Sequence, residues 1–222
     1  MEDAAALRAQ MVDELKRRGA LADVRVEEAL RALPRHRFLP GVALADAYAD
    51  RAVVVKRAGG GTPLSSASQP AMVVAMLEAL QVAPGQRVLE VGAGTGYNAG
   101  LLGSLVRPGG EVVTVELEAD LAERAAAALA DAGIDGVRVV RGDGADGFPA
   151  GAPYDRVIVT AGAAAVSTAW VEQLVDGGRL VAPVVGADGV GSVLVLDKVG
   201  GELVRRGEIP CGFLLMRAAP QP

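Results

Sequence analysis

Residues 90–97 read EVGAGTGY, and they continue the apolar run RVLEV at residues 87–91. Gly92, Gly94 and Gly96 can turn tightly and let a ligand approach the backbone, because glycine has no Cβ. The next segment, residues 98–105, is apolar and predicts a helix. A strand, a glycine-rich turn and a helix in this order are typical of the nucleotide crevice of a doubly wound α/β sheet.

The chain after this turn alternates between short apolar runs and longer helical segments. The pattern predicts strands and helices that alternate in sequence, with strands at 111–116, 137–140, 156–160 and 179–184 and helices at 117–132 and 166–175. This alternation favours a mostly parallel sheet with crossover helices. Two further runs, 192–199 and 202–208, flank Gly200–Gly201 and predict an antiparallel C-terminal hairpin, and 211–216 predicts one more strand.

The N-terminal residues predict a helical cap. Leu7, Met11 and Leu15 have helical spacing, and a second helix is expected over residues 23–33, with Asp23 as its N-cap. The following PRHRFLP segment is bounded by prolines and fits neither regular element.

The segment between this cap and the glycine turn is rich in Gly, Ser and Pro. Residues 58–70 read AGGGTPLSSASQP and predict a loop, which leads into a helix over residues 71–80. Ser68 then lies at a helix entrance, where free N–H groups and the helix dipole favour anions.

The composition excludes several classes of protein. The 222 residues contain 22 Lys and Arg against 27 Asp and Glu, a net charge of −5, and only 3% are aromatic, which disfavours a nucleic-acid partner. One cysteine and one histidine exclude an intramolecular disulfide and argue against a metal site. We find no apolar signal core and no run of about 20 apolar residues, so we expect a cytoplasmic monomer that does not enter membranes.

The spacing of the glycines indicates the kind of nucleotide. A dinucleotide fingerprint is G-x-G-x-x-G, but here the third glycine position holds Tyr97 and the spacing is G-x-G-x-G. Glu90 lies two residues before Gly92, where a carboxylate would repel a pyrophosphate. It would attract an amino group or a sulfonium, because opposite charges about 4 Å apart gain about 4 kcal/mol at an intermediate dielectric.

Polar residues end the neighbouring strands. Glu116 closes the next strand, where its carboxylate can accept hydrogen bonds from a ribose diol, and Asp143 follows the strand after that, where it can accept from an exocyclic amine. Thr160 ends a further strand, where ligands of open α/β sheets bind, so it is either a cofactor-binding residue or an ordinary strand-end residue. A single acid would be an N-cap or a solvated loop residue, but the ordered set of Glu90, Glu116 and Asp143 beside a glycine turn favours S-adenosylmethionine over NAD or no cofactor.

From residues 7 to 217 the chain resembles the protein-L-isoaspartate O-methyltransferases. The resemblance rests on PRHRF, AYAD, SSASQPAMVVAMLEAL, RVLEVGAGTGYNAGLL and RGDGADGFPAGAPYDRVIVTAGA, of which the Ser-x-Pro at residues 68–70 is the most specific. It implies a doubly wound, Rossmann-like methyltransferase sheet with an N-terminal helical cap. We expect one domain over residues 1–222, with the cap and a substrate loop in 1–70 and the core in 71–222.

The resemblance also implies an activity and residue roles. A methyl group would pass from S-adenosylmethionine to the α-carboxylate of an isoaspartyl residue in a protein or peptide, and the ester would cyclise to a succinimide that leads to repair. Ser68 would be the catalytic serine beside the substrate carboxylate and the cofactor. Gly92, Gly94 and Gly96 would line the methionine tail, Glu116 would hold the ribose and Asp143 the adenine.

The proposed chemistry explains why no catalytic histidine or cysteine is evident. A carboxylate with a pKa of roughly 3.5–4 is already ionised at neutral pH, so it needs no general base. The protein must instead align the reactants. We expect His36, Trp170 and Cys211 to be structural, whereas Tyr48 and Asp50 either border the substrate groove or fix the cap.

Two departures from the family pattern leave alternatives open. The segment GGGTPLSSAS is longer than usual and offers Ser65, Ser66 and Ser68 as the hydroxyl that contacts the substrate, and Ala71 stands where a histidine often follows the proline. One alternative is an aspartate methyltransferase dedicated to the maturation of one ribosomally made peptide. Another is a cofactor-binding module without turnover.

Overall fold

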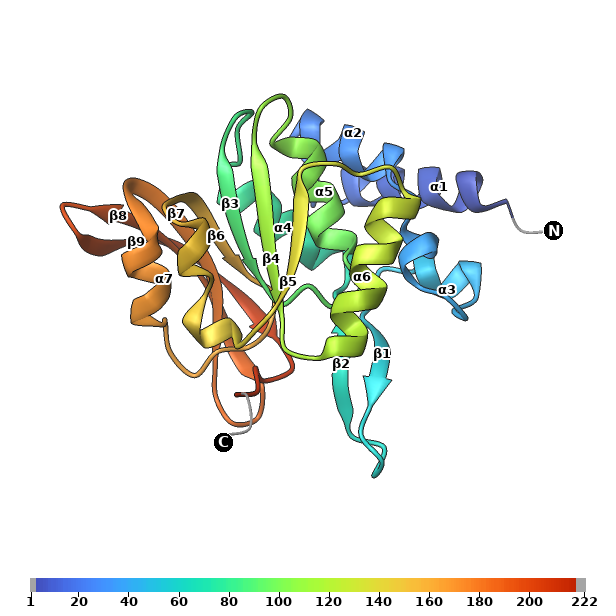
Figure 1. The fold of residues 1–222 in the computed structure, drawn as a ribbon. Coiled ribbons are helices and arrows are strands. Elements are labelled where there is room, and N and C mark those ends of the chain that lie inside the picture. The colour runs from blue at the N-terminus through green and yellow to red at the C-terminus, as the bar shows by residue number, and fades with distance from the viewer. Residues whose placement is uncertain (1–2, 219–222) are drawn as a thin grey trace.

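A seven-stranded sheet forms the centre of the computed structural model, which describes residues 3–218. Its order is β5-β4-β3-β6-β7-β8-β9 (Figure 1). The strands are β3 (Arg87–Val91), β4 (Glu111–Glu116), β5 (Val137–Arg141), β6 (Tyr154–Val159), β7 (Leu174–Val185), β8 (Val190–Val199) and β9 (Glu202–Gly212). β3 to β7 pair in parallel, and β8 and β9 are antiparallel. The predicted fold class is confirmed.

Helices cover both faces of the sheet because both faces are apolar. Successive strand residues point to opposite faces. Val88 belongs to a core on one face with Leu77 and Leu102, and Leu89 belongs to the core on the other face with Trp170. The first face carries α4 (Pro70–Leu80), α5 (Tyr97–Leu105) and α6 (Ala119–Asp131), and the second carries α7 (Thr168–Gln173) and two 3₁₀ turns, Gly144–Asp146 and Pro149–Gly151.

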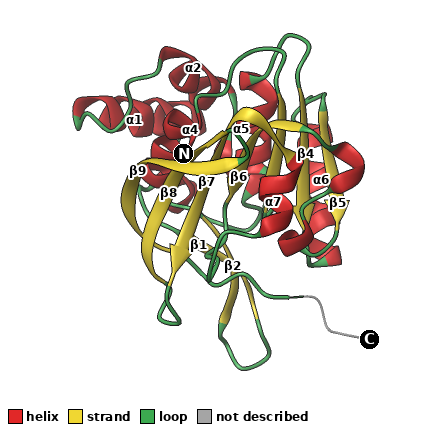
Figure 2. Ribbon diagram, turned by 90° about the vertical axis from the view of Figure 1, so that its left-hand side faces the viewer, coloured by secondary structure: helices red, strands yellow, loops and turns green. Residues whose placement is uncertain are grey.

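The N-terminal cap packs on the face that α4 and α5 cover (Figure 2). It contains α1 (Ala4–Arg17), α2 (Val24–Ala32) and α3 (Leu44–Tyr48), and Met11 and Leu30 share a core with Leu77 and Leu102. Asp23 is the N-cap of α2, as predicted, and accepts from the N–H groups of the next turn. The proline-bounded segment is not fully irregular, because Arg35–Phe38 forms a 3₁₀ turn.

The segment predicted as a loop is largely a β-hairpin. β1 (Val53–Arg57) and β2 (Pro63–Ala67) pair antiparallel with two register irregularities, and the hairpin projects beyond the sheet (Figures 1 and 2). Pro63 is tolerated because it is the first residue of its strand. The loop prediction over 58–70 is wrong for residues 63–67, because Ser and Pro indicate a loop by composition, whereas here the two strands pair with each other.

The C-terminal third differs from the prediction at its element boundaries. α7 is shorter than the predicted helix, because Ser167 caps it and β7 already begins at Leu174. Gly200 and Gly201 both have positive φ, 61° and 86°, as a two-residue hairpin turn requires. The separate strand expected at 211–216 was wrong: β9 extends to Gly212, and only a single bridge joins Leu215 to Gly162. Within residues 3–218, the helices are too short or too polar to cross a membrane.

Candidate active site

The site lies where the sheet changes direction. From β3 the chain proceeds outward through β4 and β5, and then returns to β6 on the other side of β3. Ligands of open α/β sheets bind beside the carboxyl ends of the strands at such a point. A cavity of about 670 Å³ is found there, and that volume is within the range of small-molecule sites.

The glycine turn after β3 forms one wall of this cavity. Gly92, Gly94 and Gly96 have φ of 100°, 53° and 85°, a region that favours glycine. A Cβ on Gly92 would lie 2.7 Å from the Thr160 hydroxyl, and one on Gly96 would lie 3.1 Å from the carbonyl oxygen of Ala125. The turn therefore requires glycine both for its conformation and for its packing.

Thr160 stabilises this turn by hydrogen bonds. Its hydroxyl lies 2.6 Å from the Gly92 carbonyl oxygen and 3.1 Å from the Val91 carbonyl oxygen, and its N–H also donates to Val91. Thr160 lines the cavity. The structure thus brings Thr160 to the predicted place, at the end of β6 beside the end of β3.

Glu116 faces the turn from the end of β4. One carboxylate oxygen accepts from the Gly94 N–H at 2.8 Å, and the other accepts from the Glu118 N–H at 3.1 Å. The side chain lines the cavity although the residue is only 8% exposed. A carboxylate fixed in this way can accept hydrogen bonds from hydroxyl groups of a ligand.

Glu90 lies beneath the turn and not on the cavity wall. It is fully buried, because its position in β3 points it toward the face covered by α5. There it accepts hydrogen bonds from Asn98, at 2.7 Å, and from Thr114. Burial raises the pKa of Glu90 to about 7, although these two hydrogen bonds act in the opposite direction. Glu90 therefore does not line the cavity, although it is near enough to Glu116 for that carboxylate to help raise its pKa.

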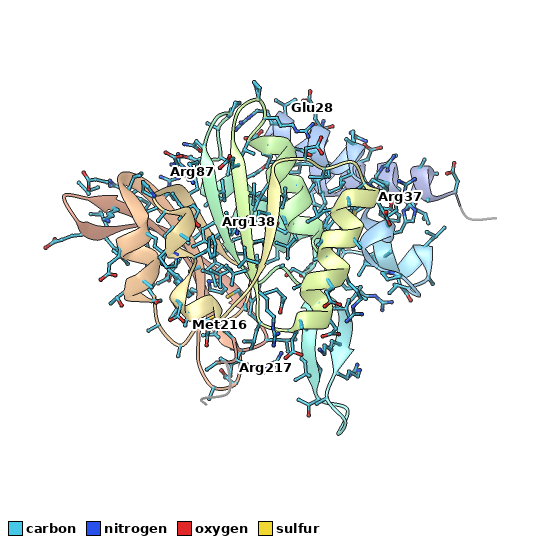
Figure 3. All side chains as sticks on the ribbon, in the orientation of Figure 1. Glu28, Arg37, Arg87, Arg138, Met216 and Arg217 are labelled. Carbon is cyan, nitrogen blue, oxygen red and sulfur yellow. The ribbon has the colours of Figure 1, made fainter. Side chains whose placement is uncertain are left out.

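Asp143 lies beside the main cavity. Its carboxylate accepts from the Ala145 N–H at 2.9 Å and caps the 3₁₀ turn Gly144–Asp146. It borders a smaller pocket of about 250 Å³, which shares Met216 and Arg217 with the main cavity. Figure 3 shows these two side chains at the carboxyl ends of the parallel strands. Asp143 is thus placed near the cofactor side but outside the main cavity.

The serine-rich segment forms the opposite wall. Ser65, Ser66 and Ser68 all line the cavity, and the Ser65 hydroxyl lies 3.8 Å from the Cβ position of Gly94. α4 begins at Pro70, directly after this segment. The three hydroxyl groups that the sequence left as alternatives therefore share one site with the glycine turn.

Residues near this wall have mostly structural partners. Asp50 accepts from the Ala71 N–H at the start of α4 and from Arg18, and the Tyr48 hydroxyl lies 2.7 Å from His36 Nδ1. Tyr48 and Asp50 thus hold the cap, and His36 is structural as expected. Trp170 is also in the core, where its indole N–H donates to Gly144. Cys211 differs from expectation: it is half-buried and lines the cavity, and burial raises the pKa of its thiol.

Three parts of the site were missed by the sequence analysis. Residues 210–217 line the cavity, Asn98 holds Glu90, and Arg35 lies at the serine-rich wall. Lys56 and Arg217 both pair with Glu118 and join the hairpin to the C-terminal segment. No motif spacing marks these residues, because they meet only through the tertiary fold.

A parallel sheet that reverses at a G-x-G-x-G turn, with an acid at the end of the next strand, defines the class of S-adenosylmethionine-dependent methyltransferases. A family model described as protein-L-isoaspartate(D-aspartate) O-methyltransferase matches residues 6–217. The chain therefore belongs to the protein-L-isoaspartate(D-aspartate) O-methyltransferase family, as the sequence resemblance predicted.

Relatives support this assignment over most of the chain. A protein-L-isoaspartate O-methyltransferase from Methanopyrus kandleri is 41% identical and aligns over 93% of this chain and 89% of its own. Protein-L-isoaspartate O-methyltransferase 1 from Rhodopseudomonas palustris is 45% identical, over 83% of this chain and 71% of its own.

Solved structures agree with the fold. One of a protein-L-isoaspartate O-methyltransferase is 31% identical with a TM-score of 0.85, and the match covers 94% of this chain and 65% of that one. A structure from Plasmodium falciparum, in complex with S-adenosyl-L-homocysteine, is 19% identical with a TM-score of 0.80 and covers 98% of this chain and 99% of its own.

Proposed function

We propose that this chain is a protein-L-isoaspartate O-methyltransferase. It transfers a methyl group from S-adenosylmethionine to the α-carboxylate of L-isoaspartyl residues in proteins or peptides, and the ester then leads through a succinimide to repair. The observation that carries the proposal is that one cavity has the glycine turn on one wall and the hydroxyl groups of Ser65, Ser66 and Ser68 on the other. Family membership over residues 6–217 supports it.

The donor side of the cavity fits S-adenosylmethionine, which supplies an electrophilic methyl group on a sulfonium. At Gly92 a Cβ would have no room, and at Gly94 and Gly96 positive φ disfavours one, so the turn presents bare backbone to the methionine tail. Glu116 holds the ribose, because its carboxylate is fixed on the cavity wall beside the turn. Asp143 serves the adenine from the adjoining smaller pocket.

Two of the predicted site residues support the glycine turn. Thr160 does so from the cavity wall, and Glu90 does so from beneath the turn. Thr160 donates a hydrogen bond to the Gly92 carbonyl oxygen and keeps the turn in its positive-φ shape. Glu90, which is buried below the turn, fixes the start of α5 through Asn98. We propose that Glu90 affects cofactor binding through this support and not by direct contact.

The acceptor side orients a carboxylate that is already ionised. Ser68 lies two residues before Pro70, the first residue of α4, so its hydroxyl can donate a hydrogen bond to the acceptor beside the positive end of that helix dipole, whose Ala71 N–H already donates to Asp50. Such donors orient the carboxylate without removing its charge. The hairpin and residues 210–217 shield the cavity from water on two sides.

A methyl-transfer assay on matched peptides tests the function. We expect methyl ester on a peptide that contains L-isoaspartate and almost none on its aspartyl counterpart. Equal turnover of the two peptides would reject repair and favour the dedicated peptide methyltransferase. Binding of S-adenosylmethionine without transfer to either peptide would favour the non-catalytic module. The relatives that match most of the chain do not favour these alternatives.

We further propose that residues 1–222 act as one domain, with the cap and substrate segment in 1–70 and the core in 71–222. Met11 of the cap and Leu102 of the core lie in the same apolar cluster, which supports a single domain. We also propose that the enzyme acts as a cytoplasmic monomer, without nucleic acid or membrane. The net charge of −5 supports the exclusion of nucleic acid, and sedimentation and cell fractionation test the rest.

A further inference from the structure

Arg35 is a buried cation in the 3₁₀ turn between α2 and α3. The residue is 1% exposed, and among residues 3–218 no carboxylate forms an ion pair with it. Burial lowers the pKa of its guanidinium. A buried charge without a direct ion pair is costly, since its hydration is lost and only the more distant Asp50 carboxylate attracts it. This cost calls for a role beyond packing.

The guanidinium touches both walls of the active-site cavity. Its Nη2 donates to the Ser68 carbonyl oxygen at 2.8 Å, and its Nε donates to the Ala47 carbonyl oxygen at 2.9 Å in α3. Its Cζ lies over the ring of Tyr97, 5.0 Å from the ring centroid, and Tyr97 is the first residue of α5 and directly follows Gly96. Arg35 and Tyr97 both line the cavity. One side chain thus connects the serine segment with the end of the glycine turn.

We propose that Arg35 is a positioning residue for methyl transfer, which sets the separation between the acceptor at Ser68 and the donor turn that ends at Gly96. The inference rests on the proposed function. Methyl transfer requires the nucleophile in line with the sulfonium, and a displacement of about 1 Å can lower the rate about 100-fold. A guanidinium suits the role because it is planar, donates to two carbonyl groups in fixed directions and stacks on an aromatic ring.

A lysine in place of Arg35 tests whether the shape of the guanidinium or only its positive charge is needed. Arg35→Lys keeps the positive charge but has neither the planar fork nor the stacking surface. If Arg35 merely attracts an anionic acceptor, lysine will suffice. Arg35→Gln removes the desolvated charge, and its amide N–H groups can still donate to a carbonyl oxygen, so this variant is expected to keep its stability.

The chain offers a matched control at the other end of α4. The Arg156 Nε donates to the Leu80 carbonyl oxygen at 2.9 Å, and burial also lowers the pKa of Arg156. It therefore resembles Arg35 in its carbonyl partner, although it is only partly buried, and Arg156 is not among the residues that line the cavity. Arg156→Lys reports what the loss of a partly buried, carbonyl-bound guanidinium does to stability alone.

The experiment measures kcat and KM for an isoaspartyl peptide, the Kd of S-adenosylhomocysteine and the Tm of all four proteins. We expect kcat to fall about 10- to 100-fold in Arg35→Lys and Arg35→Gln. The Kd should change less than about threefold, and Arg156→Lys should keep its kcat. A lowered kcat at an unchanged Tm in Arg35→Gln cannot result from unfolding.

Each contrary result identifies a different error. Full kcat in Arg35→Lys would overturn the positioning role. Equal losses of kcat in the Arg35 and Arg156 variants, in proportion to Tm, would reduce Arg35 to a structural residue. A parallel rise in Kd would place its effect on the cofactor alone. If the wild-type protein itself does not methylate the peptide, the proposed function fails and this inference fails with it.

Discussion

The two walls of the cavity are built in opposite ways. The donor wall consists of the glycine turn and of residues at the ends of β3, β4 and β6, which are strands in the interior of the sheet. The acceptor wall consists of side chains on β2 and the residues before α4, and β2 belongs to a two-stranded hairpin that projects from the molecule (Figure 1). Two strands alone have little independent stability.

The donor wall serves the methyl donor, which all such reactions share, whereas the acceptor wall serves one kind of substrate. The methyl donor is the same whatever accepts the methyl group, so its wall can be part of the rigid sheet. The acceptor is recognised by a peripheral element that can change without disturbing the core. Damage to the donor wall should therefore reduce cofactor affinity and stability together, whereas damage to the acceptor wall should reduce turnover alone.

Gly92→Ala should have the largest effect. The new Cβ would meet the Thr160 hydroxyl at 2.7 Å, and φ of 100° is unfavourable for alanine. Such strain costs about 1–3 kcal/mol, and we expect the Kd of S-adenosylhomocysteine to rise about 100-fold, as measured by calorimetry. Gly60→Ala at the hairpin tip is the control, because its Cβ meets nothing within 4 Å. Equal affinities of the two variants would contradict a donor wall that depends on glycine.

The donor wall should also be sensitive to pH through Glu90. The pKa of this carboxyl is about 7 in the folded protein against 4.5 when unperturbed, so the folded state binds the proton more tightly. Its contribution to the free energy of unfolding is complete below pH 4.5 and is lost as the pH rises through 7. Between pH 5 and pH 8 this loss corresponds to about 2–3 kcal/mol.

Urea unfolding at both pH values tests this effect. Glu90→Gln should be less sensitive to pH than the wild type, since glutamine has no proton to lose. Glu111→Gln, at the exposed start of β4, should keep the wild-type dependence. A pH dependence that Glu90→Gln leaves unchanged would mean that another group is responsible.

Ser68→Ala on the acceptor wall should lower kcat, whereas Glu116→Ala on the donor wall should lower cofactor affinity. We expect Ser68→Ala to lower kcat about 10- to 100-fold with little change in cofactor affinity, because a hydrogen bond to a charged group contributes about 1.5–3 kcal/mol. Glu116→Ala should raise the Kd of the cofactor about tenfold instead. If Ser68→Ala is fully active and Ser65→Ala or Ser66→Ala is inactive, the catalytic hydroxyl lies two or three positions earlier on the same wall.

The smallest effect is expected where the hairpin is tied to the core. Lys56 pairs with Glu118 and Asp120, which raises its pKa, and Glu118 also pairs with Arg217 at 2.8 Å. Lys56→Met should raise the dissociation rate of S-adenosylhomocysteine about two- to fivefold in stopped-flow measurements, since a partly exposed ion pair contributes about 1 kcal/mol or less. Arg57→Met is the control, because Arg57 donates to Gly61 within the hairpin. Identical dissociation rates in Lys56→Met and Arg57→Met would show that the ion pairs of Lys56 do not slow the release of the ligand.

The donor wall could largely be predicted from the sequence, and the acceptor wall could not. Gly92, Gly94, Gly96 and Glu116 are identified by local spacing and by their position after a strand, and parallel strands bring their carboxyl ends together. The role of Glu90 depends on which face of β3 its side chain points to. The sequence of a short apolar strand does not show which of its two faces α5 covers. Its prediction as a contact residue therefore remains a prediction, and the structure favours a position beneath the turn.

The acceptor wall depends on pairings between distant residues. Residues 63–67 resemble a loop in composition, and they form a strand only because residues 53–57 lie beside them. Arg35 contacts Ser68, which is 33 positions away, and no periodicity links the two. Local patterns therefore predicted the elements of the sheet, but not the side chains that the cap brings to its edge.

The shared core of the cap and the sheet has a consequence for synthesis on the ribosome. Met11 and Leu15 belong to the same apolar cluster as Val193 and Val195 in β8. The cap helices leave the ribosome early, but α4 and α5, which α2 contacts, are translated later, and the β8 residues that complete the shared cluster come only near the end of the chain. Until then, the nascent cap exposes surface that chaperones or aggregation could capture, so this protein is expected to finish folding only when translation is nearly complete.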